Sequence, residues 1–295
     1  MRSTESIFQT ITSEAALRAA WARVRSNGGG AGGDGLDLAT FGGSLDVRLA
    51  DLSLRLRDGS YRPGPLRDVP MRRTDGRIRH LRIPCISDRV IQTACQALLS
   101  ERLDPKLSAA SFGYRPSRSV DQALGAVRNL IDKRASWVFD ADIAAFFDNV
   151  CHGRLMDDLG IWIDDANLRV LIGQWLRGFG DGKGLAQGAP ISPLLSNIFL
   201  HPLDQALLQD GPGLVRYADD FVVLTGTRAE VLKASRQAEE VLGRRGLCLN
   251  PAKTQILPIE DGFVFLGARI VGTGARGQRN SLQIAPMNRS TAPRP

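Results

Sequence analysis

The chain has 295 residues, of which 43% are hydrophobic, and a formal net charge of +7 at pH 7. That length and apolar content predict a globular protein of one large or two modest domains, and no apolar run reaches the roughly 18 residues of a membrane-spanning helix. The positive charge indicates a polyanionic partner more than it indicates any particular fold, and no membrane partner is expected. Four cysteines and three histidines lack the spacing of a zinc site or a disulfide framework, and without a signal-peptide core the expected location is cytoplasmic.

The N-terminal region is predicted to be helical. Residues 1–26 favour a pair of helices, with the best pattern over 13–21. The glycine-rich segment 27–35 has neither a preceding strand nor a following Lys-Ser/Thr, so we interpret it as a flexible joint instead of a phosphate-binding loop. Residues 36–60 resume a helix that Pro63 stops, with leucines at spacings of three and four: Leu45, Leu49, Leu52 and Leu56.

Cationic residues concentrate in the next segment. Between Arg55 and Arg118 there are 14 Lys/Arg and 6 Asp/Glu, and 13 of the 14 cations are Arg, which suits bidentate phosphate contacts. Residues 67–84 predict a cationic hairpin around the turn at 74–76. Residues 85–103 predict a helix with Arg89 and Gln96 on its exposed side. The loop 111–119 interleaves aromatic residues with arginine and favours nucleic-acid contact, with a structural loop as the alternative, and a helix capped near Ser119 follows.

Two pairs of carboxylates are the candidates for a catalytic site. Residues 137–143 predict an apolar strand in which Asp140 and Asp142 share a face, because side chains alternate with a period of two. Residues 214–224 predict a hairpin with Asp219 and Asp220 at its turn, where a solvated turn is the alternative. Buried carboxylates are costly unless a cation compensates them. A divalent metal shared by Asp142 and the turn would provide that compensation.

Helices and one strand are expected in the remaining segments. A helical region runs to about residue 178, and a glycine-rich loop spans 182–190. Ser192 and Pro193 start a helix to about 209 with a kink near Pro202. A helix over 228–245 and a strand over 262–270 follow, and the sequence beyond 271 favours a loose tail. Strands at 137–143, 214–224 and 262–270 predict an α+β fold with an antiparallel sheet and helices on one face.

In this order the segments resemble reverse transcriptases of the bacterial group II intron type, over about residues 27–270. The matching segments are 27–41, 61–63, 76–84, 88–92, 111–119, Asp142-Ile-Ala-Ala-Phe-Phe-Asp148, Gln187-Gly-Ala-Pro-Ile-Ser-Pro193, Tyr217-Ala-Asp-Asp220, Leu249-Asn-Pro-Ala-Lys253 and Phe265-Leu-Gly267. The chain departs from the family's fingers motifs at Met71-Arg72-Arg73 and Arg79-His80-Leu81-Arg82, but positive charge is retained in both segments. The motif at 187–193 argues against the diversity-generating subgroup.

The resemblance implies the fingers and palm of a right-hand polymerase, with an antiparallel palm sheet. It implies an N-terminal helical extension over 1–60, fingers over 61–136, a palm over 137–270 that includes fingers insertions, and a flexible tail over 271–295. Family members continue into a thumb and often a maturase region, whereas 25 residues follow Ile270 here. We therefore expect the thumb to be absent or truncated, or replaced by a protein or RNA partner, and we expect no intron splicing.

The activity that the resemblance implies is RNA-directed DNA polymerisation with two Mg²⁺ ions, which Mn²⁺ can replace. Its implied partners are an RNA template, a DNA or RNA primer and dNTPs. A host system such as CRISPR spacer acquisition or anti-phage defence belongs to the family's repertoire. The alternatives are a catalytically weak nucleic-acid-binding scaffold of a larger complex, and untemplated or protein-primed DNA synthesis.

The resemblance also assigns roles to individual residues. Catalysis and metal binding fall on Asp142, Asp219 and Asp220, with Ile143 as a further metal ligand, whereas Asp140 and Asp148 are expected to be structural. The nucleotide-binding residues are Arg73, Arg79, Phe147, Gln187, Gly188 and Lys253. The alternatives are core packing for Phe147, in place of a steric gate, and an exposed lysine at Lys253, in place of a proton donor. The nucleic-acid-binding residues are Arg72, Arg77, Arg82, Arg115, Arg118, Phe265, Leu266 and Gly267.

Overall fold

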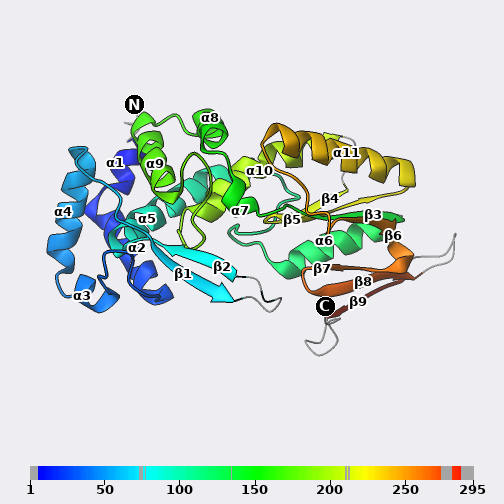
Figure 1. Ribbon diagram of the computed structural model, residues 1–295, viewed down its shortest axis with the longest axis horizontal. Helices are drawn as coiled ribbons and strands as arrows, with labels where there is room; N and C mark the ends of the chain where they lie inside the picture. The colour runs from blue at the N-terminus through cyan, green and yellow to red at the C-terminus, as the bar shows by residue number, and fades with distance from the viewer. Residues whose placement is uncertain are drawn as a thin grey trace. The chain divides into compact units, whose positions relative to one another are not determined.

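The computed structural model describes residues 6–72, 76, 78–133, 135–209, 211, 213–273 and 281–286 (Figure 1). The chain divides into two compact units, each made of two segments. Unit 1 comprises Met1–Pro105 and Phe147–Ile198, and unit 2 comprises Lys106–Phe146 and Phe199–Pro295. The division falls inside helix α10 (Ser192–Gln209), which contains Pro202. Within the described ranges, no helix is long and apolar enough to span a membrane.

The N-terminal helices of unit 1 follow the predicted pattern. The expected helix pair is α1 (Ile7–Ile11) and α2 (Glu14–Asn27), and α2 starts at Ser13, whose side chain accepts a hydrogen bond from the Ala16 N–H. The expected helix over 36–60 is two helices, α3 (Leu38–Gly42) and α4 (Leu45–Arg57). Three of the four leucines with helical spacing are buried in α4, which confirms the apolar face: Leu49, Leu52 and Leu56.

The glycine-rich loop and Arg89 differ from their predictions. Arg89 lies in α5 (Ile86–Leu103) and is 7% exposed, because its Nη2 donates to the Gly30 carbonyl at 2.6 Å. The Gly33 N–H donates to the Pro65 carbonyl, and a Cβ at Gly32 would lie 2.4 Å from the backbone of Cys85. The loop is therefore packed against its neighbours and is not a free joint. Helical periodicity could not show that a loop covers this side of α5. Gln96 is likewise only half-exposed.

The predicted cationic hairpin is present in unit 1. Strands β1 (Arg67–Arg72) and β2 (Ile78–Ile83) pair antiparallel, with Arg67 opposite Ile83. Residues 73–75 and 77 lie outside the described residues. Further helices lie between residues 104 and 179. They include η1 (Asp104–Lys106), α7 (Phe146–Asn149), α8 (His152–Trp162) and α9 (Ala166–Phe179).

Unit 2 is built on a four-stranded antiparallel sheet with the order β4-β5-β3-β6. Its strands are β4 (Leu214–Tyr217), β5 (Asp220–Thr225), β3 (Trp137–Asp142) and β6 (Gln255–Pro258). The predicted hairpin around Asp219 is the β4–β5 pair. The sequence did not indicate β6, because it is a four-residue edge strand that ends in proline and depends on its pairing with β3.

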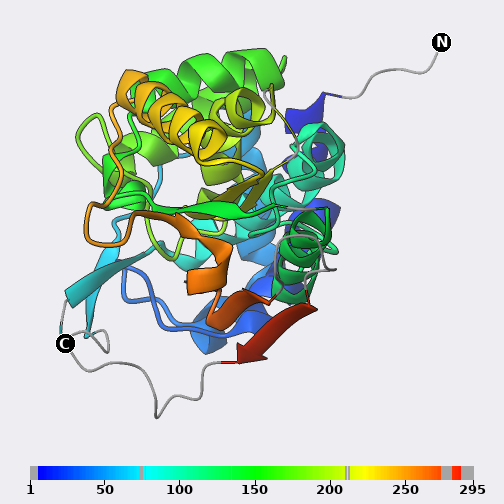
Figure 2. The same ribbon diagram turned by 90° about the vertical axis from the view of Figure 1, so that its right-hand side faces the viewer.

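Helices cover both faces of this sheet, which corrects the expectation of one covered face. On one face, Val138, Val222 and Leu224 pack with buried side chains of α6 (Val120–Asp132). On the other face, Phe139 and Phe221 make an edge-to-face contact. Helix α11 (Arg228–Arg244) packs on β3 and β5, and Figures 1 and 2 show it on the opposite side of the sheet from α6.

A second sheet replaces the single strand expected over 262–270. Strands β7 (Phe263–Phe265) and β8 (Ala268–Thr273) form a hairpin, and β9 (Ser281–Pro286) pairs with β8. Leu266 and Gly267 have φ of 51° and 75°, so they form a two-residue turn that the apolar pattern concealed. Strand β9 lies within the tail that was expected to be flexible. The rest of that tail, 274–280 and 287–295, is outside the described residues.

Candidate active site

The strand register of unit 2 brings three carboxylates to one face of the sheet. Asp142 on β3 lies directly opposite Asp220 on β5, and Asp140 lies opposite Val222. Residues paired across antiparallel strands point to the same face, so Asp140, Asp142 and Asp220 share a face, as the period of two predicted for the first two. Asp219 belongs to the two-residue β4–β5 loop, whose first residue, Ala218, has φ of 60°.

Both carboxylate oxygens of Asp142 have partners on the segment before β6. Lys253 Nζ lies 3.1 Å from Oδ1, and Asn250 Nδ2 donates to Oδ2 at 3.2 Å. The Asn250 N–H donates to the Asp142 carbonyl at 2.8 Å, so the backbone fixes this segment beside β3. The Asp142 side chain is 20% exposed and that of Lys253 is 47% exposed. Asp142 is therefore reachable from solvent and already has a cation beside it.

Burial and mutual repulsion raise the pKa of two carboxyl groups at this site. The pKa of Asp220 rises to about 7, chiefly because of burial and then because Asp140, Asp142 and Asp219 are negative. Burial raises the pKa of Asp140 to about 6, although Gln255 Nε2 donates to its Oδ2 at 2.8 Å and opposes the shift. The site therefore concentrates negative charge that a cation would stabilise.

The donor chemistry of this cluster fits a hard divalent cation. Carboxylate and carbonyl oxygens are the ligands that Mg²⁺ prefers. Burial is the main cause of the raised pKa of Asp220, and the neighbouring carboxylates add to it, so a cation would favour the ionised form. In the part of the chain that the structure describes, no three Asp, Glu, His or Cys side chains already form a metal-binding group. Ile143 is buried and bridges to Leu249 through its backbone.

In unit 1, four predicted site residues come together where β2 meets the loop before α10. The Arg79 side chain donates to the side chain of Gln187, and the Arg82 N–H donates to the Gln187 carbonyl at 2.9 Å. Gly188 has φ of 120° and lies so close to the Arg82 carbonyl that a Cβ there would be 3.1 Å from it. Arg72 is exposed on β1, whereas Arg73 and Arg77 lie outside the described residues.

The other predicted site residues have mainly structural contacts. Phe147 is 7% exposed in α7, and its carbonyl accepts a hydrogen bond from the Leu185 N–H, whereas Asp148 is exposed. Arg115 is 8% exposed and donates to the Ser111 carbonyl at 2.8 Å. Arg118 stacks over the Phe112 ring. Phe265 is fully buried in the core cluster beside α6. Leu266 and Gly267 form the end of the β7–β8 hairpin, where Leu266 is partly buried against the same cluster and Gly267 is exposed.

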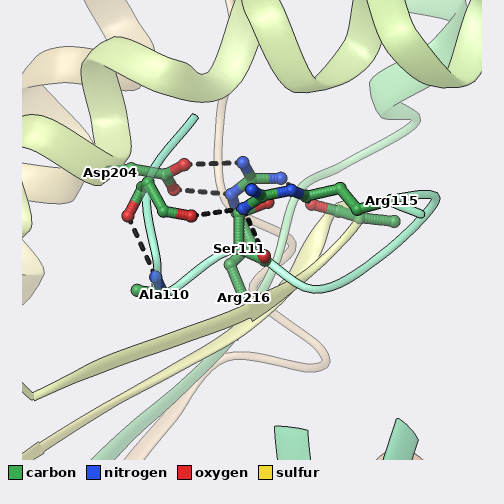
Figure 3. A network of polar contacts seen from close by, with 7 residues as sticks. Ala110, Ser111, Arg115, Asp204 and Arg216 are labelled. Carbon is green, nitrogen blue, oxygen red and sulfur yellow. Dashed lines mark hydrogen bonds and ion pairs between the residues drawn. The ribbon is translucent and has the colours of Figure 1, made fainter. Parts of the chain in front are cut away.

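Sequence reasoning missed four residues that organise this region. Asn250 and Gln255 were overlooked because their contacts with Asp142 and Asp140 depend on tertiary pairing. Asp204 on α10 and Arg216 on β4 of the β4–β5 hairpin form a fully buried ion pair (Figure 3). The usable signal was a charge of each sign inside an otherwise apolar helix and strand, since fully buried charges are rarely left unpaired.

Comparison with known proteins agrees with this geometry. Residues 71–270 match the family described as reverse transcriptase (RNA-dependent DNA polymerase). The chain is 31% identical over 307 residues to protein YkfC of Escherichia coli, covering 88% of this chain and 81% of YkfC. It is 32% identical over 179 residues to the group II intron-encoded protein LtrA of Lactococcus lactis, covering 58% of this chain but 30% of LtrA.

Comparison of folds gives the same class. A structure of apo telomerase from Candida tropicalis matches with a TM-score of 0.57 at 13% identity, covering 75% of this chain and 55% of the telomerase. At that identity the likeness concerns the fold alone. Together with the family match, it shows that the chain belongs to the reverse transcriptases, a family of RNA-directed DNA polymerases, and that its relatives include group II intron-encoded proteins.

Proposed function

We propose that this chain is an RNA-directed DNA polymerase whose catalytic centre is the carboxylate cluster of unit 2. The observation that carries the proposal is the direct pairing of Asp142 with Asp220 on neighbouring strands, beside Asp219 in the hairpin loop. Burial and like charge raise the pKa of Asp220 to about 7, and a bound cation would stabilise the ionised carboxylates of this cluster. Family membership supports the same reaction.

The metal-binding residues in this proposal are Asp142, Asp219, Asp220 and the carbonyl of Ile143. Two Mg²⁺ ions bound there would activate the primer 3′-hydroxyl and neutralise charge on the departing pyrophosphate. Lys253 Nζ lies 3.1 Å from Asp142 Oδ1 in the structure. Once it is released from Asp142, its ammonium group can hold or protonate the pyrophosphate. Asn250 keeps its hydrogen bond to Asp142 and fixes the carboxylate orientation.

The proposal also assigns substrate-binding roles to individual residues. Arg73 and Arg79 bind the incoming triphosphate, Gln187 and Gly188 form the floor of the nucleotide pocket, and Phe147 excludes a ribose 2′-hydroxyl. The contact between the Arg79 and Gln187 side chains, and the close approach of Gly188 to the Arg82 carbonyl, support this grouping. The proposed contacts with the template and primer are made by Arg72, Arg77, Arg82, Arg115, Arg118, Phe265, Leu266 and Gly267.

Primer extension tests the proposed function. Purified protein is incubated with an RNA template of mixed sequence, an annealed DNA primer, Mg²⁺ and either dNTPs or rNTPs, beside an Asp219→Asn/Asp220→Asn variant. We expect the wild type to add dNTPs complementary to the template, and the variant to add none at the same protein concentration. Additions that ignore the template would favour untemplated synthesis. RNA binding without any extension would favour the scaffold alternative.

A further inference from the structure

A fully buried ion pair joins helix α10 to strand β4 of the proposed catalytic hairpin. The side chains of Asp204 on α10 and Arg216 on β4 are both 0% exposed. Arg216 Nε donates to one carboxylate oxygen at 2.6 Å, and Nη2 donates to the other at 2.6 Å (Figure 3). This two-point contact fixes the plane of the guanidinium as well as its position.

The guanidinium makes a third contact, with the catalytic loop itself. Arg216 Nη1 donates to the carbonyl of Ala218 at 2.8 Å. Ala218 is the residue between Tyr217 and Asp219, and its φ of 60° lies in the left-handed region that a residue with a Cβ avoids. The hydrogen bond therefore holds the carbonyl of a strained residue that directly precedes two proposed metal ligands.

The backbone around Arg216 is held on its other side by residues 110–113. The Arg216 N–H donates to the Ala110 carbonyl at 2.8 Å, and the Phe112 N–H donates to the Arg216 carbonyl at 2.8 Å. A Cβ at Gly113 would lie 2.4 Å from the Ala218 backbone nitrogen, so only glycine permits this approach. Arg115 closes the segment by donating to the Ser111 carbonyl. The strained loop therefore has support on two sides.

We propose that Asp204 and Arg216 are positioning residues that hold the left-handed turn at Ala218 and so set the positions of Asp219 and Asp220. This inference rests on the proposed function of the carboxylate cluster. An ion pair this deeply buried adds little stability compared with apolar side chains of similar size, so stability alone does not account for it. The planar guanidinium explains the buried pair better, because Nε and Nη2 are held by Asp204 while Nη1 donates to Ala218 in the loop before Asp219.

An Arg216→Lys variant tests the proposal while it keeps the charge. A lysine ammonium can pair with Asp204 but cannot reproduce the planar, three-point contact that includes Ala218. We expect kcat for single-nucleotide addition to fall by about 10- to 100-fold with KM for dNTP nearly unchanged, because misplaced ligands slow the reaction without weakening substrate binding. The matched control is Arg245→Lys, in which a half-buried arginine over the Phe199 ring is replaced, and it should leave kcat unchanged.

Rescue separates positioning from general destabilisation. Glycine adopts a positive φ without the penalty that alanine has, so Ala218→Gly in the Arg216→Lys background should recover about 3- to 10-fold in kcat. A second variant, Asp204→Leu/Arg216→Met, removes both buried charges together and should unfold at a temperature close to that of the wild type while its kcat remains low. A wild-type kcat in this double variant would overturn the proposal.

Amide hydrogen exchange provides a readout that does not need activity. In Arg216→Lys we expect faster exchange over residues 214–225 and wild-type exchange over β3, because only the hairpin loses its support. If wild-type protein extends no primer, the proposed function fails, whereas the exchange result still tests the positioning role. Unchanged exchange at 214–225 together with an unchanged kcat in Arg216→Lys would contradict that role.

Discussion

Lys253 contacts the candidate site and has a role of its own in the proposed reaction. Its ammonium lies 3.1 Å from Asp142, the carboxylate that pairs with Asp220 across the strands. Its charge lowers the pKa of Asp220 and so partly opposes the effects of burial and of the neighbouring carboxylates. In the proposed reaction, Lys253 contacts the metal ligand Asp142 and also neutralises the departing pyrophosphate. Replacing Lys253 would therefore have two separable effects, one on the Mg²⁺ concentration that the enzyme requires and one on the rate of nucleotide addition.

The first prediction separates charge from proton donation at Lys253. We expect Lys253→Ala to lower the rate of single-nucleotide incorporation by about 100-fold, the typical contribution of a positioned acid. Lys253→Arg should remain slow, because arginine keeps a positive charge but does not release a proton near neutral pH. The rates come from rapid-quench measurements, with Lys233→Ala on α11 as the control. Full activity in Lys253→Arg would assign the residue a purely electrostatic role.

The second prediction concerns Asp88, a carboxyl group buried in unit 1. It accepts hydrogen bonds from the Tyr61 hydroxyl at 2.5 Å and the Gly64 N–H at 2.9 Å, but burial dominates and raises its pKa from 3.8 to about 6. The folded state therefore binds a proton that the unfolded state releases between these values. The stabilisation from Asp88 is fully present below pH 3.8 and is lost as pH rises through about 6.

An Asp88→Asn variant isolates this effect, because asparagine does not titrate. Relative to the variant, the wild type should lose roughly 1 kcal/mol of unfolding free energy between about pH 5 and pH 7, from a total near 3 kcal/mol over the whole range. Urea unfolding of both proteins at each pH gives the difference, and titrations elsewhere in the chain cancel in it. A difference that is constant with pH would show that the pKa of Asp88 is not raised in the folded chain.

At the scale of elements, the sequence predicts those whose signal is local. The cap at Ser119, the apolar face of α4 and the turn around Asp219 all depend on residues within a few positions of one another. Strand β6 and the turn at Leu266 were missed because pairing with β3, and a leucine with positive φ, are tertiary features. The burial of Arg89 was also not predicted, because the loop that covers it lies about 60 positions earlier in the chain.

The third prediction tests the cap of α6. Ser119 accepts a hydrogen bond from the Gln122 N–H, and Gln122 accepts one from the Ser119 N–H, so two backbone donors at the helix start are satisfied. Ser119→Ala should lower the unfolding free energy by about 1 kcal/mol. Ser44 is the matched control, because it precedes α4 without a side-chain cap hydrogen bond, and Ser44→Ala should cost less than about 0.5 kcal/mol. Equal losses in urea unfolding would contradict the assigned cap.

At the scale of the whole molecule, the charge distribution supports a polyanionic substrate. The net charge is +7, and the segment from Arg55 to Arg118 carries 14 of the 38 Lys and Arg residues with only 6 of the 31 Asp and Glu residues. Part of this segment is the exposed β1–β2 hairpin. Affinity that arises from phosphate contacts depends on salt, because each contact releases condensed counterions.

The fourth prediction measures that dependence. Binding of an RNA–DNA primer-template is followed by fluorescence anisotropy between about 50 and 200 mM salt. Arg72→Gln and Arg79→Gln should each reduce the slope of log K against log salt by roughly 0.7 to 1. Arg236→Gln on α11 removes an exposed cation from unit 2 as the control and should leave the slope unchanged. Equal slopes for all the variants would place the phosphate contacts outside the hairpin.

The carboxylates of the candidate site could be predicted from the sequence, whereas the residues that contact them could not. Asp140, Asp142, Asp219 and Asp220 follow from strand alternation and a turn motif, and their order along the chain matches the family. Asn250, Gln255 and the ion pair of Asp204 with Arg216 depend on register and helix packing, which no local pattern encodes. Site residues were therefore accessible as motifs, while the contacts that position them required the structure.

The most direct test of the central claim is the Mg²⁺ dependence of template-complementary dNTP addition on RNA, compared between wild type and Asp142→Asn. The account predicts saturable activation of the wild type by Mg²⁺ and a rate at least about 1,000-fold lower in the variant at every Mg²⁺ concentration, because the substitution removes a proposed ligand of the metal ions that drive the displacement. Extension that proceeds equally without Mg²⁺, or an Asp142→Asn variant as fast as the wild type, would contradict the account.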